Sequence, residues 1–199
     1  MRIPIYSLFI FNNWRQIIGN RRGIFNGSFK DKYEQLDRII LNNDTLFSNY
    51  DCKDYFKYVA DVVINRDQSK QLLKFVPKIS IEQFNEKREW IYLYLIEDRI
   101  IKIGGTRVGL QGRARSYLSG YYTVERGKSG LCSITNAAIY NLFNYSLEKG
   151  YKVKMYGYML PKVETEIIII DRKLTVPVQT YHIYEKIFID NYLEKYKLK

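Results

Sequence analysis

Apolar and polar positions follow two different periods along the chain. In the first part, Lys30–Leu41 and Asp51–Val63 space their apolar side chains as one face of an α-helix does. A third short helix is expected over Gln68–Phe75, because the residue that precedes Pro77 avoids the helical region. Residues 1–88 are therefore expected to form a helical N-terminal region.

From Trp90 onwards the pattern favours strands. Trp90–Ile96 is a run of aromatic and branched residues, and a second apolar run, Ile100–Gly104, follows the polar residues 97–99. The two runs are expected to form a β-hairpin. The later elements are expected to be a helix over Gln111–Leu118, a helix over Thr135–Lys149, a strand over Tyr151–Leu160, a hairpin of Val163–Asp171 with Leu174–Val178, and a helix over Thr180–Tyr196.

These elements predict an α+β fold, in which helices flank a small three-stranded sheet of mixed or antiparallel strands. The helical region 1–88 precedes a second region, 89–199, in which residues 119–150 are expected to carry an extra helix. With 46% hydrophobic residues the chain is too apolar to be disordered. Two cysteines, Cys52 and Cys132, and one histidine exclude a disulfide framework and a four-ligand zinc site.

The charge balance of the chain indicates the kind of molecule that it binds. The chain has 32 Lys and Arg against 21 Asp and Glu, a net charge of +11, which attracts polyanions, most often nucleic acid. A solvated basic surface is the alternative explanation. The densest basic stretch runs from Arg99 to Lys128, and the DNA contacts expected within it are Arg107, Arg115, Arg126 and Lys128.

The chain is expected to have no membrane segment. The longest apolar run near the N-terminus is interrupted by Pro4 and Ser7 and is too short to span a bilayer. It also lacks the basic start and the cleavage site of a signal peptide. The expected location is therefore the cytoplasm.

A tyrosine and a lysine are expected to share one face of the first hairpin. If residues 97–99 form a three-residue loop, Tyr94 lies opposite Lys102, and Tyr92 lies one diagonal step away, roughly 7–8 Å from it. Lys102 interrupts an apolar strand, so its pKa should be lowered and it needs an anionic partner. It could hold Tyr92 as a phenolate or orient an attacking water. Tyr92 could also be an ordinary strand aromatic.

The helix after the hairpin carries a candidate phosphate contact. Arg113 and Tyr117 are four residues apart and share a helix face, whereas Arg115 points nearly opposite. A guanidinium offers forked donors that suit phosphate oxygens and the charge that develops during phosphodiester cleavage. We therefore expect Arg113 to act with Tyr117, and Arg115 to be an ordinary surface residue.

The last helix carries a candidate metal ligand. Glu185 is the single acid in its first turns, and its helical neighbours are apolar or aromatic. A buried carboxylate is costly unless a cation compensates it, and Mg²⁺ is one such cation. A buried salt bridge to Lys186 or Arg113 is the alternative. Nearby His182 is expected to be a surface residue or a phosphate contact.

The order of these motifs resembles the GIY-YIG nuclease family. Tyr92 lies in WIYLYL and Lys102 in IKIGGT, and the segments GRARSY and YEKIFIDNYLEKY follow, so the resemblance covers about residues 89–199. The first glycine of the family motif is Trp90 here, the second tyrosine is Lys102, and no Pro-Asn pair follows the last helix. A lysine at that second position resembles one branch of restriction endonucleases in the family.

The resemblance implies Mg²⁺-dependent hydrolysis of double-stranded DNA, with Mn²⁺ as a possible substitute, by a Type II restriction endonuclease. The implied roles are general base for Tyr92, assistance by Lys102, phosphate binding by Arg113 and Tyr117, and Mg²⁺ binding by Glu185, with Glu164 or Glu166 as the next metal candidates. A symmetric homodimer is expected, joined through the N-terminal helices or the 119–150 insertion. A mobile-element (homing) or repair nuclease of the same family and a non-catalytic DNA-binding protein are the alternatives.

Overall fold

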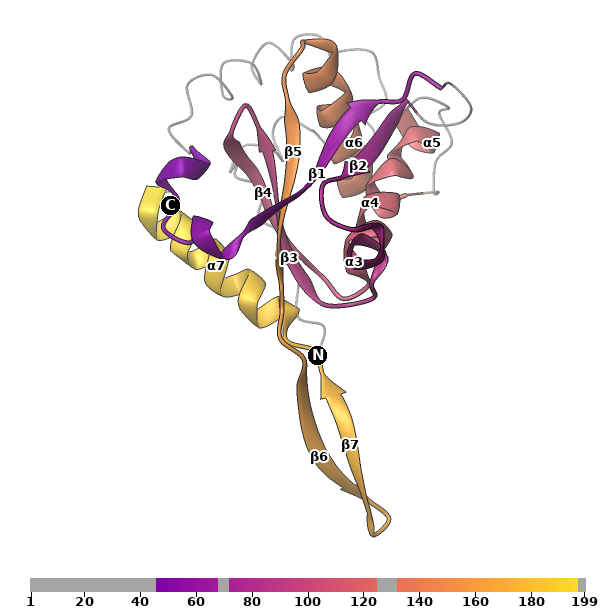
Figure 1. The fold of residues 1–199 in the computed structure, drawn as a ribbon, viewed down its shortest axis with the longest axis vertical. Coiled ribbons are helices and arrows are strands. Elements are labelled where there is room, and N and C mark those ends of the chain that lie inside the picture. The colour runs from indigo at the N-terminus through magenta and orange to yellow at the C-terminus, as the bar shows by residue number, and fades with distance from the viewer. Residues whose placement is uncertain (1–45, 68–71, 125–131, 197–199) are drawn as a thin grey trace.

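The structure is a computed structural model, and it describes residues 46–67, 72–124 and 132–196. Among these residues five antiparallel strands form one sheet in the order β2-β1-β5-β3-β4 (Figure 1). The strands are β1 (Lys57–Ile64), β2 (Leu73–Pro77), β3 (Trp90–Ile96), β4 (Arg99–Thr106) and β5 (Val153–Met159). A separate hairpin is made of β6 (Val163–Ile169) and β7 (Arg172–Val178).

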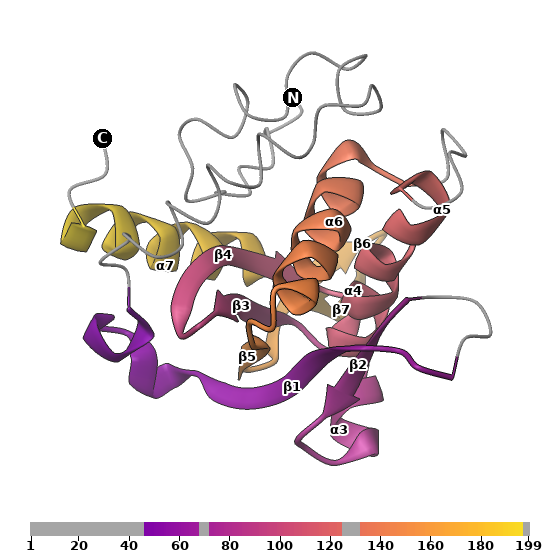
Figure 2. The ribbon, with the colours of Figure 1, turned by 90° about the horizontal axis from the view of Figure 1, so that it is seen from above.

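Helices cover both faces of the five-stranded sheet. They are α3 (Ile81–Asn85), α4 (Gly109–Leu118), α5 (Gly120–Val124), α6 (Ile134–Glu148) and α7 (Tyr181–Tyr196), preceded by the short 3₁₀ turns η1 (Phe47–Asn49) and η2 (Lys53–Tyr55). In Figure 2, α7 lies on one side of the sheet, and α4 and α6 lie on the other. No helix in the described ranges is long and apolar enough to cross a bilayer.

Strand β3 is the centre of the core, and all seven of its residues are buried. Tyr92 and Tyr94 point into the cluster formed with α4 and α6, whereas Ile91 and Leu93 point into the cluster formed with α7. Successive side chains of a strand point to opposite faces, so a strand covered on both faces needs an unbroken apolar run. The WIYLYLI sequence of β3 meets that need.

The β3–β4 turn differs from the expected three-residue loop. Glu97 and Asp98 both have positive φ, 47° and 61°, and form a two-residue turn in which Ile96 pairs with Arg99. An irregularity after Tyr94 shifts the register by one residue. The expected pairing of Tyr94 with Lys102 is therefore confirmed, although the turn that produces it is shorter.

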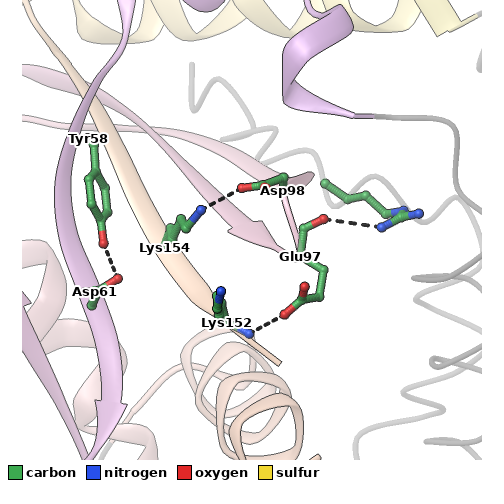
Figure 3. Close-up of polar contacts among 7 residues, drawn as sticks. Tyr58, Asp61, Glu97, Asp98, Lys152 and Lys154 are labelled. Carbon is green, nitrogen blue, oxygen red and sulfur yellow. Dashed lines mark hydrogen bonds and ion pairs between the residues drawn. The ribbon is translucent and has the colours of Figure 1, made fainter. Parts of the chain in front are cut away.

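Polar contacts tie this turn to β5 and lie beside a similar contact on β1 (Figure 3). The carboxylate of Asp98 pairs with Lys154 Nζ at 2.8 Å, and Glu97 Oε1 accepts a hydrogen bond from the backbone N–H of Lys152 at 2.6 Å. On β1, the Tyr58 hydroxyl donates to the Asp61 carboxylate. The contacts of Asp98 and Glu97 join segments far apart in the sequence at the end of the sheet where β3 turns into β4.

Two expected helices are wrong. Asp51–Val63 and Gln68–Phe75 were expected to be helical, but the structure has β1 over Lys57–Ile64 and β2 over Leu73–Pro77. The apolar positions in these stretches also fit half-buried strands, and pairing with β5 decides between the two readings. The sheet has five strands, not three, and it crosses the expected boundary at residue 88. The helix expected over residues 30–41 lies outside the described residues.

The sequence did not predict the short helices α3 and α5, and the remaining elements agree with it except at their ends. Helix α6 begins after Ser133, whose Oγ accepts from the backbone N–H of Asn136 at 3.1 Å, and not at Thr135. The turn of the β6–β7 hairpin is formed by Ile170 and Asp171, one residue earlier than expected. The α+β class holds: helices flank an antiparallel sheet.

Candidate active site

The β3–β4 hairpin brings Tyr92 and Lys102 to the same face of the sheet. Tyr94 pairs with Lys102, and Tyr92 pairs with Gly104, two residues along each strand. A Cβ atom at Gly104 would collide with the Tyr92 hydroxyl. The glycine therefore leaves the space that this hydroxyl occupies.

Helix α4 supplies an arginine and a second tyrosine to the Tyr92 hydroxyl. Arg113 Nε donates to Tyr92 Oη at 2.8 Å, and Arg113 Nη2 donates to Tyr117 Oη at 2.7 Å. The two hydroxyl oxygens lie 2.8 Å apart and share a hydrogen bond. Bidentate donation from one planar guanidinium holds both oxygens in a defined position. This hydrogen-bonded group of Tyr92, Arg113 and Tyr117 is called the Tyr–Arg–Tyr cluster below.

The cluster controls the charge that the Tyr92 oxygen can carry. Burial raises the pKa of Tyr92 above its ordinary value, so the hydroxyl is protonated at neutral pH. The Arg113 charge and the hydrogen bonds from Tyr117 and Arg113 oppose that rise. If the proton leaves, a fixed cation is already in place to stabilise the phenolate.

Lys102 is fully buried next to this cluster. Burial, followed by the charge of Arg113, lowers its pKa from 10.5 to about 7, and the carboxylate of Glu185 opposes the change. An amine with such a pKa is partly neutral at physiological pH and can accept a proton. General bases work best when their pKa lies near the working pH.

The same burial costs stability, and this is testable. We expect Lys102→Met to raise the free energy of unfolding by about 1–4 kcal/mol at pH 7, because the lowered pKa of Lys102, which already includes the opposing charge of Glu185, costs the wild type stability. The unfolded state binds more protons than the folded state between pH 7 and 10.5, so wild-type stability rises across that interval. The advantage of the variant should therefore shrink as the pH increases. Urea unfolding at several pH values measures it, and Lys186→Met, at an exposed lysine, is the control.

Helix α7 brings a carboxylate to the edge of the sheet. Glu185 is 7% exposed, and β4, against which it lies, is the last strand in the sheet order. A Cβ atom at Gly105 would lie 3.1 Å from Glu185 Oε2, so the glycine permits this close approach. Burial raises the pKa of Glu185, whereas the charge of Lys102 and a hydrogen bond from the Gly105 backbone lower it. The charges of the carboxylate and of the buried amine therefore influence each other.

The residues present fit Mg²⁺ better than a metal with an all-protein ligand set. Within the described residues no group of three His, Cys, Asp or Glu side chains could hold a metal ion. Mg²⁺ commonly takes one or two protein carboxylates and completes its shell with waters and substrate phosphates. Glu185 can be such a carboxylate. The other candidates, Glu164 and Glu166, are exposed on the β6–β7 hairpin, where Glu166 pairs with Lys173 at 2.7 Å.

The arrangement of strands and helices is that of a known nuclease structure. The fold is shared with a restriction endonuclease. A solved structure described as restriction endonuclease HPY188I in complex with product DNA superposes with a TM-score of 0.52, 22% identity, and coverage of 80% of this chain and 86% of that chain. A mutant of bacteriophage T4 EndoII gives a TM-score of 0.46 and 21% identity, with coverage of 70% and 90%. No protein-family model and no curated protein matched the chain.

The other basic candidates lie apart from the Tyr–Arg–Tyr cluster. Arg115 is exposed and lines a separate pocket between β2, α3 and α4. Arg107 is exposed and donates from Nη1 to Gln179 Oε1 at 3.2 Å. Arg126 and Lys128 lie outside the described residues. The structure thus separates Arg113 from Arg115, as their helical positions indicated.

The lone histidine and the cysteines take no direct part in the cluster. His182 is exposed and packs edge-on against Tyr181, and its charge lowers the pKa of Glu185 only as the last of several causes. Cys52 is half-buried and donates from Sγ to Asn191 Oδ1 at 3.3 Å. Cys132 is also half-buried, so neither cysteine is fully buried in the core.

One residue that holds the site was not found from the sequence. Glu89 Oε2 accepts hydrogen bonds from the backbone N–H of Thr180 at 2.8 Å and from its hydroxyl at 3.0 Å. Thr180 immediately precedes α7, and its carbonyl accepts from the backbone N–H of Ile183 in the first turn. Glu89 thereby joins the start of β3 to the start of the helix that carries Glu185. The partners are 91 residues apart, so no local pattern reveals them.

We expect Glu89→Ala to loosen this junction. Two buried donors of Thr180 would lose their acceptor, which typically costs about 1–3 kcal/mol. Glu89→Gln retains an oxygen that accepts both hydrogen bonds and should recover most of the stability. Chemical unfolding of the two variants measures the difference, and equal destabilisation by both would contradict the hydrogen-bonding role.

Proposed function

We propose that this chain is a Mg²⁺-dependent, sequence-specific endonuclease of the GIY-YIG type that cuts double-stranded DNA as a Type II restriction enzyme. The observation that carries the proposal is the Tyr–Arg–Tyr cluster beside two buried ionisable groups, Lys102 and Glu185. Two further facts support it. The fold is shared with a protein described as a restriction endonuclease bound to product DNA, and the chain carries a net charge of +11.

In the proposed reaction, Tyr92 is the general base and Lys102 sets its protonation state. The amine of Lys102, whose pKa is about 7, is partly protonated near neutral pH, and its positive charge favours loss of the Tyr92 phenol proton to water. The Arg113 guanidinium stabilises the phenolate that remains. The phenolate then removes a proton from the water that attacks phosphorus.

Arg113 and Tyr117 are proposed to hold the scissile phosphate. Arg113 is half-buried, so its guanidinium can reach a ligand while remaining fixed by the two tyrosines. Negative charge builds up on the phosphate oxygens during cleavage, and a donor that is already positioned needs no reorganisation to stabilise it. The same guanidinium would thus serve both the base and the phosphate.

Glu185 is proposed to hold the metal ion. A bound Mg²⁺, or Mn²⁺ in its place, would stabilise the charge on the leaving oxygen. A buried carboxylate beside Lys102 and the Gly105 backbone is oriented before any ion arrives. Removal of the carboxylate charge should therefore abolish metal binding and leave the rest of the site unchanged.

The proposal is tested by digesting several unrelated DNAs with the protein and Mg²⁺. A restriction enzyme gives a discrete, reproducible set of bands, and sequencing of the ends identifies one short site. Cutting only at long or structured sites would favour a homing or repair nuclease. Binding that depends strongly on salt is expected in each case, because phosphate contacts release counterions.

Cleavage of both strands at one short site suggests two copies of the chain. One catalytic cluster per chain serves one strand, and a symmetric dimer places two clusters on opposite strands of a palindrome. A homodimer is therefore part of the proposal. Residues 1–88 and the 119–150 insertion are the segments in which the sequence suggested the contacts.

A further inference from the structure

The β6–β7 hairpin extends away from the rest of the molecule, between β5 and α7 (Figure 1). β6 and β7 pair with each other, and among the described strands neither pairs with another. An isolated two-stranded hairpin is only marginally stable in water, and an unpaired strand edge invites further pairing. The hairpin is therefore expected to gain stability from a contact beyond its own two strands.

The register of this hairpin divides its side chains into two unlike faces. Pairs such as Ile167 with Leu174 alternate with pairs such as Glu166 with Thr175. The first set, called the apolar face, consists of Val163, Thr165, Ile167, Ile169, Leu174, Val176 and Val178, and of the paired residues on that side only Arg172, next to the turn, is charged. The polar face consists of Glu164, Glu166, Ile168, Lys173, Thr175 and Pro177.

Most of the apolar face is open to solvent, and Ile167 and Val176 on it are half-buried. Leu174 is 44% exposed and Ile169 is 49% exposed, and at the turn Ile170 is 89% exposed. The alternation is broken at Ile168, which lies on the polar face and is 77% exposed, but the other apolar residues of the two strands gather on one face, as in a strand with one covered face. A contiguous apolar surface rimmed by polar residues usually marks an interaction site.

The charge of the hairpin argues against DNA as the molecule that covers it. Residues 163–178 contain two basic and three acidic residues, a net charge of −1 in a chain of +11. Glu164 and Glu166 would face a duplex laid against the polar side. A protein surface meets the apolar face without such repulsion.

We propose that the apolar face is the surface through which two copies of this chain associate. A two-fold axis brings the same patch of both copies together, and an apolar patch is complementary to itself. Each hairpin carries nearly balanced charge, so the two tips can approach although the whole chains repel each other. The contact would cover Ile167 and Leu174 of both copies at its centre.

The base of the hairpin is connected to the elements that carry the candidate site. Arg107, from the loop after β4, donates to Gln179 between β7 and α7. The base of the hairpin is thus tied to the strand that carries Lys102 and to the helix that carries Glu185. The link to cutting both strands rests on the proposed function, whereas the association itself does not.

Sedimentation of the full DNA-free chain over a range of concentrations tests the inference. We expect a dimer for the wild type, and for Ile167→Glu and Leu174→Glu a dissociation constant raised about a hundredfold, because each substitution enters the interface twice. Ile168→Glu is the matched control. It has the same residue type, lies next to Ile167 on the opposite face, and should change the constant by less than about threefold.

Several results would overturn the inference. They are a wild type that stays monomeric at every concentration, an Ile168→Glu variant that dissociates as readily as Ile167→Glu, and apolar-face variants that remain dimeric but lose affinity for DNA. Circular dichroism and thermal unfolding verify that each variant is folded. A dimer that forms through this face but does not cut DNA would contradict the proposed function and still support the interface.

Discussion

Replacement of Glu185 by glutamine is expected to abolish Mg²⁺-dependent DNA cleavage and to leave DNA binding nearly unchanged. The amide has the shape of the carboxylate, so packing beneath α7 is preserved, but the charge that would hold the ion is lost. Mg²⁺ strongly prefers carboxylate oxygens, and no group of three ligating side chains exists elsewhere in the described chain to replace it. Cleavage rate and duplex affinity of the same preparation measure the two parts of the prediction.

Glu194→Gln is the control for this substitution. Glu194 lies on the same helix and is exposed, so the same chemical change there should alter neither cleavage nor binding. A Glu185→Gln enzyme that cuts at the wild-type rate would show that the metal ligand lies elsewhere. Glu164 and Glu166 would then be the next residues to test.

Arg113→Ala is expected to lower the cleavage rate about 10²–10³-fold, the usual loss when one positioned donor to a transition state is removed. Arg113 donates to both Tyr92 and Tyr117, so its loss removes two of the three hydrogen bonds of the Tyr–Arg–Tyr cluster together with its cation. The loss should appear in the rate constant of cleavage at saturating DNA. Affinity should fall much less, because many other phosphate contacts remain.

Arg115→Ala provides the comparison, since it removes the same side chain two residues along the same helix. Arg115 is exposed and faces another pocket, so its loss should have a small effect on the cleavage rate. Equal losses in the two variants would contradict the role of the Tyr–Arg–Tyr cluster.

Local patterns were enough to bring most of the candidate residues together. The β3–β4 pairing follows from two apolar runs with a polar turn between them, and it places Tyr92 and Lys102 on one face whether the turn has two or three residues, because an irregularity absorbs the difference. The four-residue spacing of Arg113 and Tyr117 is likewise a property of one helix. Interactions confined to one hairpin or one helix are visible in the sequence.

Contacts between distant segments were not predictable in the same way. β1 was expected to be a helix because its apolar spacing fits both structures, and only its pairing with β5, far along the chain, selects the strand. The approach of Glu185 to Gly105 depends on how α7 docks at the edge strand. The hydrogen bonds of Glu89 with Thr180 depend on the same docking. No periodicity within a segment encodes these partners.

The most direct test of Mg²⁺-dependent DNA cleavage uses one labelled duplex that contains the identified site. Plasmid DNA takes the place of this duplex as long as the site is unknown. Binding and cleavage are measured in the same mixture, with Mg²⁺ and with EDTA. We predict that the protein binds DNA in both conditions and cuts it only with Mg²⁺, in agreement with a single buried carboxylate beside a lysine whose pKa is about 7. Binding without cleavage in Mg²⁺ or Mn²⁺ would contradict the claim and identify a DNA-binding protein instead.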